Sequence, residues 1–198
     1  LENLATDEDR EILNTTIGHR TLTQSIDEVQ AYIQTIIPRI EPHIIPESTH
    51  NQTPILKPTD SQIAKTTNTF LQSHRNLFLD LEHQGIFSAQ PNQRVLEIGF
   101  DTGGYSLFAL EQLGFQVSGI DNQYGGLVEA GALPEYIKKN LHSQVSFHHG
   151  DITQTTHFDD ETFDVIYSAS VLEHITDIPN ALTEMFRLLK PNGVLIHK

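Results

Sequence analysis

Short apolar runs alternate with longer helix-like stretches along the second half of the chain. Strands that alternate with helices in this way are typical of a parallel sheet with crossover helices. The pattern therefore predicts an α/β fold from Arg94 onward. We predict strands at residues 94–98, 116–120, 144–149, 163–168 and 193–198, and helices at residues 105–114, 134–141 and 179–190.

The first part of the chain has a helical period instead. Apolar residues at helical spacing predict a helix over residues 25–37, which Pro38 ends. A proline-rich stretch follows, for which we predict a surface loop. A second helix is predicted over residues 60–84, and Gly85 is placed to end it. One side of this helix carries Ile63, Phe70, Leu71, His74, Leu77, Phe78 and Leu81.

This change of pattern divides the chain into parts of unequal size. Residues 1–60 would form a helical and proline-rich segment, and residues 61–198 would form the α/β domain. The amino-terminal helices could simply cover the sheet, or they could form a lid over a substrate pocket. The sequence leaves both interpretations open.

Composition narrows the possible partners. The chain has a formal charge of −14 at pH 7 and no visible basic patch, so neither nucleic acid nor an anionic membrane is expected to bind it. The absence of cysteine excludes disulfides, thiolate metal sites and a cysteine nucleophile. No apolar stretch is long enough to span a membrane, and the acidic first residues do not resemble a signal peptide. A cytoplasmic setting fits these features.

Metal binding is not predicted either. His148 and His149 are adjacent in a predicted strand, so they face opposite sides of it. The 11 histidines of the chain include no pair with HxxxH spacing. We therefore expect no metal site.

Acidic residues stand near the carboxyl ends of the first three predicted strands. The stretch VLEIGFDTGG carries Glu97 just before a glycine-rich turn, Asp121 ends the next strand, and Asp151 follows the third. Ligands of open α/β sheets bind beyond this edge, and a carboxylate matches the two hydroxyls of a ribose. A single strand-end aspartate is more often a helix cap. The three acids together predict a nucleoside site.

These motifs resemble those of the class I S-adenosylmethionine-dependent methyltransferases, specifically the broad small-molecule methyltransferase group. VLEIGFDTGGYS is similar to their first motif, GIDNQ to the acidic loop after the second strand, and GDI to the adenine-contact loop. FDVIYSASVLEHI and LLKPNG are similar to the fourth-strand and fifth-strand signatures. The resemblance covers residues 70–198 and implies a Rossmann-like, doubly wound, mostly parallel sheet with helices on both faces.

The resemblance also implies which residues bind the cofactor, S-adenosyl-L-methionine. Glu97 would orient the glycine turn and approach the methionine end of the cofactor, and Asp121 would hold the ribose. Asp101 departs from the family pattern, which usually has a glycine at that place. The implied cofactor-binding residues are Glu97, Gly99, Phe100, Asp101 and Gly103 in the turn, Asp121 and Asn122 at the ribose and adenine, Asp151 and Ile152 around the adenine ring, and Ser168 near the methionine moiety.

The implied function is in-line transfer of a methyl group to a hydroxyl, nitrogen or carbon of a small molecule, such as a sugar or another metabolite. His174, in LEHI after the fourth strand, is the candidate catalytic base or substrate contact, although histidine there can also have neither role. A non-catalytic cofactor-binding or interaction protein with the same fold is the alternative, and Asp101 is the hint for it. A nicotinamide-dependent oxidoreductase is a weaker third candidate, because no GxGxxG follows the first strand.

The fold implied by the resemblance has seven strands, of which this sequence supplies five. We therefore expect the methyltransferase domain to be truncated after strand five, and the chain to be part of a longer polypeptide. The strand at residues 193–198 would then be an open sheet edge that could pair with another chain.

Overall fold

The computed structural model of the protein describes residues 16–19, 57–100, 103–123 and 128–198. The chain divides into two units. The glycine-turn unit is Ser48–Ile152, and the carboxyl-terminal unit combines Leu1–Glu47 with Thr153–Lys198. The helix predicted over residues 25–37 and most of the proline-rich stretch lie outside the described residues. The division at residue 60 therefore stays a prediction.

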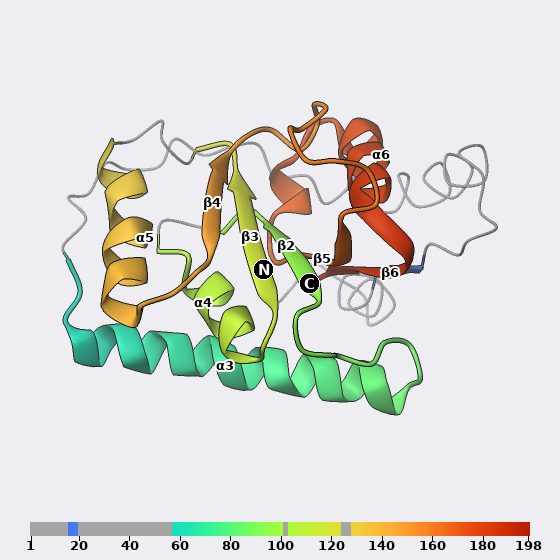
Figure 1. Ribbon diagram of the computed structural model, residues 1–198. Coiled ribbons are helices and arrows are strands. Elements are labelled where there is room, and N and C mark those ends of the chain that lie inside the picture. The colour runs from blue at the N-terminus through green and yellow to red at the C-terminus, as the bar shows by residue number, and fades with distance from the viewer. Residues whose placement is uncertain (1–15, 20–56, 101–102, 124–127) are drawn as a thin grey trace, which may run out of the picture. The chain divides into compact units, whose positions relative to one another are not determined.

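Parallel strands form the centre of the glycine-turn unit. β2 (Arg94–Ile98) pairs with β3 (Gln116–Asp121), and β3 pairs with β4 (Ser146–His149). Helix α4 (Tyr105–Gln112) connects β2 to β3, and α5 (Val128–Leu141) connects β3 to β4, as Figure 1 shows. Parallel strands need such crossovers because each new strand starts at the opposite end of the sheet. The predicted α/β class is confirmed, and β2 has its predicted bounds.

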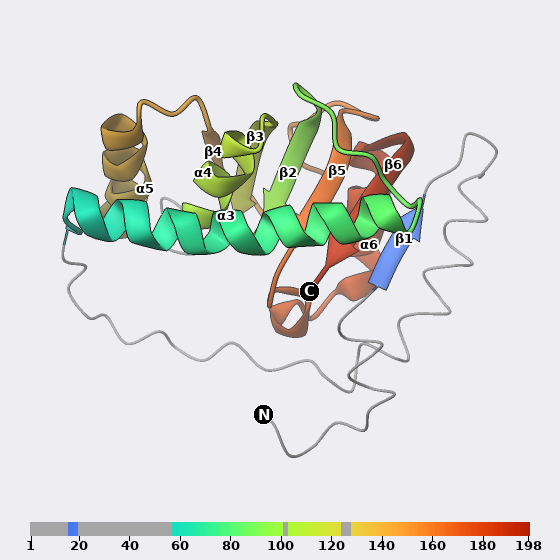
Figure 2. The ribbon, with the colours of Figure 1, turned by 90° about the horizontal axis from the view of Figure 1, so that it is seen from below.

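Helix α3 (Asp60–His83) lies alongside α4 in both ribbon views (Figures 1 and 2). Its start is a capping box, in which the Thr59 hydroxyl accepts from the Gln62 backbone N–H and the Gln62 side chain accepts from the Thr59 N–H. Gly85, with a φ of +68°, follows the last turn as predicted. The buried residues of α3 are Ile63, Thr67, His74, Phe78 and Leu81.

The carboxyl-terminal unit contains a second pair of parallel strands. β5 (Phe163–Ser168) lies beside β6 (Leu189–His197), and the 3-10 turn η2 (Leu172–His174) and helix α6 (Ile178–Leu188) connect them. A further strand, β1 (Thr16–His19), pairs antiparallel with β6. The prediction of an open edge at residues 193–198 is therefore wrong, because β1 occupies that edge.

Two elements extend several residues beyond their predicted bounds. β6 begins at Leu189, and its pairing with β5 contains a register irregularity near Val165. Helix α5 begins at Val128 and holds Pro134 in its interior, where a proline usually costs about 3 kcal/mol. Burial of the Leu133 and Ile137 side chains offsets this cost, because both remove apolar surface from water.

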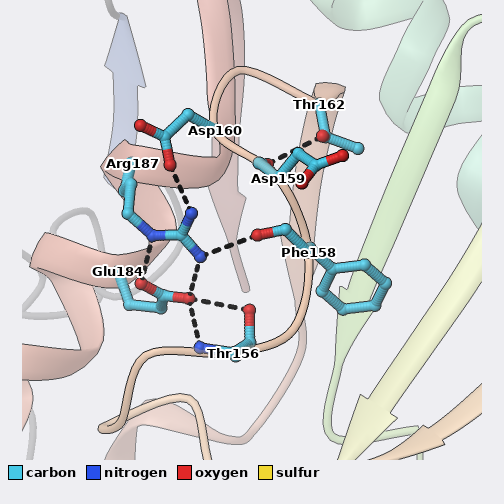
Figure 3. A network of polar contacts seen from close by, with 7 residues as sticks. All are labelled: Thr156, Phe158, Asp159, Asp160, Thr162, Glu184 and Arg187. Carbon is cyan, nitrogen blue, oxygen red and sulfur yellow. Dashed lines mark hydrogen bonds and ion pairs between the residues drawn. The ribbon is translucent and has the colours of Figure 1, made fainter.

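A buried carboxylate ties the segment before β5 to α6 (Figure 3). Glu184 accepts hydrogen bonds from the backbone N–H and the hydroxyl of Thr156, each at 2.7 Å. The guanidinium of Arg187 donates to both carboxyl oxygens of Glu184, and also to Asp160 and to the Phe158 carbonyl. Burial opposes the charge of Glu184, but the hydrogen bonds from Arg187 and Thr156 outweigh it and lower the pKa of the carboxyl. The network therefore fixes residues 156–160 against the helix.

Candidate functional site

The carboxyl ends of β2, β3 and β4 meet at one edge of the glycine-turn unit. The backbone N–H of Gly99 donates to the Ile120 carbonyl at 2.8 Å, and the N–H of Gly150 donates to the Asp121 carbonyl at 3.1 Å. The segments that follow these strands therefore begin side by side. Ligands of α/β sheets bind at this kind of edge.

The glycine turn has the backbone geometry that its sequence requires. Gly99 has a φ of +67° and Gly104 a φ of +62°, which glycine adopts without steric strain. An added Cβ at Gly103 would lie 2.3 Å from the Tyr105 ring, so a side chain at this position would require that ring to move. Asp101, which replaces the usual glycine, lies outside the described residues.

Glu97 is a buried acid at the end of β2. Glu97 is 3% exposed, and burial raises the pKa of its carboxyl to about 8, although a hydrogen bond with Ser106 opposes this shift. Its Oε2 atom has no hydrogen-bond partner among the described residues. A buried polar atom without a partner is costly unless a ligand or water satisfies it. Glu97 is therefore the clearest sign of a ligand site in this unit.

Two polar residues that the sequence analysis did not assign to the site are connected to Glu97. Ser106, in the first turn of α4, forms the hydrogen bond with the Glu97 carboxyl, and its Oγ lies 2.8 Å from Nε2 of His74 on α3. A serine at the start of the helix after the glycine turn was a signal for Ser106. His74 gave no such signal, because it lies 32 residues from Ser106 and only the tertiary fold brings them together.

Asp121 and Asn122 end β3 next to β4. Oδ1 of Asp121 accepts from the backbone N–H of Gln123 at 2.7 Å, so the carboxylate shapes its own turn. The carboxylate can still accept further hydrogen bonds, because each oxygen has two lone pairs. Nε2 of His149, the residue opposite Asp121 on β4, lies 2.9 Å from the Asn122 carbonyl and donates to it. Nothing in the sequence pattern signals this contact.

The remaining predicted residues of this unit differ in exposure. The Phe100 ring is buried, with its centroid 5.4 Å from that of Phe147, so Phe100 would reach a ligand through its backbone. Ile152 is also buried, whereas Asp151 is exposed just after β4. The adjacent residues Asp151 and Ile152 thus supply a polar and an apolar group just after β4. The adenine contacts assigned to them stay predictions.

Ser168 and His174 lie in the carboxyl-terminal unit. Ser168 is buried at the end of β5, and its Oγ lies 2.9 Å from Nδ1 of His197. His174 is the exposed last residue of η2, and its backbone N–H donates to the Val171 carbonyl. The roles assigned to Ser168 and His174 stay predictions.

Over the described ranges, no cluster of three or more histidine and acidic residues is arranged to hold a metal ion. In the same part of the chain, no helix combines the length and the apolar character that a membrane crossing requires.

The motifs and the fold also match known proteins. A protein-family model for a methyltransferase domain matches residues 96–197, which run from β2 to the end of β6. Over 107 residues, the chain is 36% identical to phosphoethanolamine N-methyltransferase 1 of Arabidopsis thaliana, a match that covers 54% of this chain and 21% of the plant protein. Over 105 residues, it is 30% identical to sterol 24-C-methyltransferase erg6 of Schizosaccharomyces pombe, covering 53% of this chain and 27% of the yeast protein.

A solved structure supports the fold. The chain matches the crystal structure of the YcgJ protein from Bacillus subtilis with a TM-score of 0.51 and 19% sequence identity. The match covers 68% of this chain and 50% of that chain. At this identity the likeness concerns the fold alone. The chain therefore spans a minor share of its curated relatives and half of this structural neighbour.

Proposed function

Because the chain belongs to the methyltransferase domain family, and with it to the class I S-adenosylmethionine-dependent methyltransferases, we propose that it transfers a methyl group from S-adenosylmethionine to a small molecule. Class membership implies this cofactor. The methyl-transfer activity and the acceptor are proposals, because the match spans only 21% of the Arabidopsis relative.

The observation that carries the proposal is the buried Glu97 carboxyl. Its Oε2 atom lacks a hydrogen-bond partner within the described residues, and the carboxyl lies at the strand edge where ligands bind. The ammonium group of an amino-acid moiety is the partner that such an oxygen favours, because a charge-assisted hydrogen bond would satisfy it. S-adenosylmethionine carries that group on its methionine end. The residues therefore fit this cofactor.

Each polar group at the edge has a proposed task in holding the cofactor. Glu97 would accept from the ammonium, Asp121 would accept from the ribose hydroxyls, and Asp151 would accept from the adenine amine. The backbone of the glycine turn would approach closely, since Gly103 carries no side chain and an added Cβ would collide with the Tyr105 ring. The same residues would leave the rest of the edge to the acceptor.

S-adenosylmethionine supplies a methyl group on a positively charged sulfur, which a nucleophile displaces in line. The protein therefore contributes mainly by aligning the reactants and excluding water, and alignment of this kind can be worth about 7–11 kcal/mol. A neutral hydroxyl acceptor would also need a base, for which His174 is the candidate. An amine acceptor in its neutral form would need alignment only.

The identity of the acceptor is the finer part of the proposal. The relatives bear the names of phosphoethanolamine and sterol methyltransferases, so related domains serve both nitrogen and carbon acceptors. We propose a small-molecule acceptor for this chain, because its charge of −14 opposes nucleic acid. A non-catalytic cofactor-binding protein remains the alternative function, since Asp101 departs from the usual motif.

Calorimetric titration tests the cofactor first. The chain should bind S-adenosylhomocysteine and should not bind NAD at comparable concentrations. A methyl-transfer assay with labelled S-adenosylmethionine against phosphorylated amines, sterols and sugars then separates an enzyme from a binding protein. Binding of NAD in preference to S-adenosylhomocysteine would overturn the proposal, whereas binding without transfer to any acceptor would favour the non-catalytic alternative.

A further inference from the structure

A chain of three buried polar side chains runs through the glycine-turn unit. His74 of α3 is 1% exposed, Ser106 of α4 is 7% exposed, and Glu97 of β2 is 3% exposed. Nε2 of His74 lies 2.8 Å from Oγ of Ser106, and Ser106 in turn forms a hydrogen bond with the Glu97 carboxyl. Buried polar residues are costly to retain unless their hydrogen bonds serve stability or function.

The single proton of the Ser106 hydroxyl couples the two ends of this chain. An ionised Glu97 can only accept, so Ser106 must donate to it and must itself accept from Nε2–H of His74. A protonated Glu97 can donate to Ser106, whose hydroxyl can then turn towards an unprotonated Nε2 of His74. A donor at position 74 therefore favours the arrangement that supports the charged form of Glu97.

The Glu97 end of this chain of polar side chains indicates a ligand. Oε2 of Glu97 has no hydrogen-bond partner among the described residues, although the carboxyl is almost completely buried. We propose that His74 is a positioning residue, which acts through Ser106 to favour the ionised form of Glu97 when the ammonium group of an amino-acid moiety binds. This inference rests on the proposed function, because it assumes a ligand with such a moiety.

The groups around Glu97 leave this role to Ser106 and His74. Gly119 is opposite Glu97 on β3 and has no side chain, and an added Cβ there would touch Leu107 and Phe100. The titratable residues on β3 and β4 are Asp121 at the end of β3 and the adjacent His148 and His149 at the end of β4. On the helices, the titratable residues adjacent in sequence are Arg75, which follows His74 on α3, and Tyr105, which precedes Ser106 on α4. In the described residues, burial and the Ser106 hydroxyl are the two influences on the pKa of Glu97.

A pair of ligands separates this role from a structural one. S-adenosylhomocysteine carries the amino-acid moiety, whereas methylthioadenosine has the same nucleoside without it. His74→Phe, which keeps a ring but removes the donor, should weaken S-adenosylhomocysteine about five- to tenfold at pH 7, a typical loss for a hydrogen bond that supports a charge. It should leave the affinity for methylthioadenosine unchanged. His74→Gln, which restores a donor at a similar reach, should recover most of the loss.

The pH profile gives a second readout. Binding of the ammonium needs Glu97 ionised, so the loss in His74→Phe should be largest near pH 6 and should shrink towards pH 9. The ammonium group of the ligand titrates in the same way in both experiments. The ratio of the affinities of the parent chain and of His74→Phe therefore reports on the titration of the protein alone. Thr67→Val, a buried substitution elsewhere on α3, is the matched control and should alter neither ligand.

The outcomes are distinguishable. If the unchanged chain binds neither ligand, the proposed function fails and this inference with it. If the chain binds both and His74→Phe binds them equally well, or loses both equally at every pH, the inference alone is overturned. Should His74→Phe not fold, Ser106→Ala on α4 removes one hydroxyl and so interrupts the same chain of polar side chains. It must then show the same selective loss of S-adenosylhomocysteine.

Discussion

The Oγ atom of Ser168 lies 2.9 Å from Nδ1 of His197, where the parallel strands β5 and β6 end side by side. Both residues are buried, and burial lowers the pKa of His197 to about 4. His197 is therefore neutral at pH 7, with one ring nitrogen engaged by Ser168. The sequence resemblance implied a cofactor role for Ser168, but the described contact of its hydroxyl is internal to the carboxyl-terminal unit.

The burial of His197 predicts a loss of stability in mild acid. The unfolded chain takes up a proton on His197 below about pH 6.5, whereas the folded chain resists it until about pH 4. Stability is therefore lost as the pH falls through this window, by roughly 2–3 kcal/mol for this group. His197→Asn, which can still bond to Ser168 but does not titrate, should not show this acid-induced loss of stability. Urea unfolding at pH 7 and pH 4.5 measures it, and an equal acid sensitivity in both proteins would contradict the assignment.

Local pattern was enough to predict the buried strands. Residues 94–98 and 163–168 are apolar runs between polar segments, and both form strands with the predicted bounds. The strand β1 was missed because a run of four residues has no period of its own. It is a strand because its backbone pairs with β6, and that pairing is distant in sequence. The start of α5 was missed because Pro134 signals a helix boundary more often than an interior position.

The candidate site shows the same limit. Glu97, the glycines of the turn and Asp121 could be predicted because each follows its own strand by a fixed spacing. His74 could not be predicted, since on α3 it is one of several residues along an otherwise mostly apolar side. Its chemical meaning depends on Ser106 lying opposite, which only the packing of two helices provides.

Glu184 should be the most costly residue to replace in the network of Figure 3. Glu184→Ala removes the acceptor of Thr156 and the main partner of Arg187, so we expect a loss of roughly 2–4 kcal/mol in the free energy of unfolding. Asp160 also bonds to Arg187, but its side chain is 74% exposed. Asp160→Ala should therefore change stability by less than about 1 kcal/mol. Denaturant titrations compare the two, and similar losses would contradict the central place of Glu184.

Asp121 can be tested with a pair of variants that separates its turn from its charge. Asp121→Asn keeps an oxygen for the Gln123 N–H but removes the charge, whereas Asp121→Ala removes both. If the carboxylate holds the ribose, both variants should weaken S-adenosylhomocysteine by about 1.5–3 kcal/mol, because a hydrogen bond to a charged group is lost. Calorimetry gives the affinities, and circular dichroism checks the fold. Unchanged affinity in Asp121→Asn would sink the ribose assignment.

His174 has a kinetic prediction. If it is the base, His174→Ala should lower kcat about a hundredfold or more with little change in cofactor affinity. The defect should shrink as the pH rises and the acceptor hydroxyl ionises unaided. Steady-state rates between pH 6 and pH 9 measure this, with His142→Ala, another exposed histidine, as the control. An equal defect at every pH would indicate that His174 positions the substrate instead.

Glu97 predicts a trade between stability and binding. The folded chain holds a proton on this carboxyl up to about pH 8, whereas in the unfolded chain the carboxyl ionises near pH 4.5. The folded state therefore binds more protons between these values, and the contribution of Glu97 to stability falls as the pH rises through them. Glu97→Gln, which is neutral at every pH, should match the stability of the parent chain near pH 4.5 and exceed it by roughly 2–4 kcal/mol at pH 8.

Glu97→Gln should also lose S-adenosylhomocysteine while keeping methylthioadenosine, because the amide cannot supply a charge to the ammonium. Thermal unfolding across this range, with and without each ligand, measures both effects. A carboxyl retained only for packing would lower stability when replaced and would leave the two ligands equally affected.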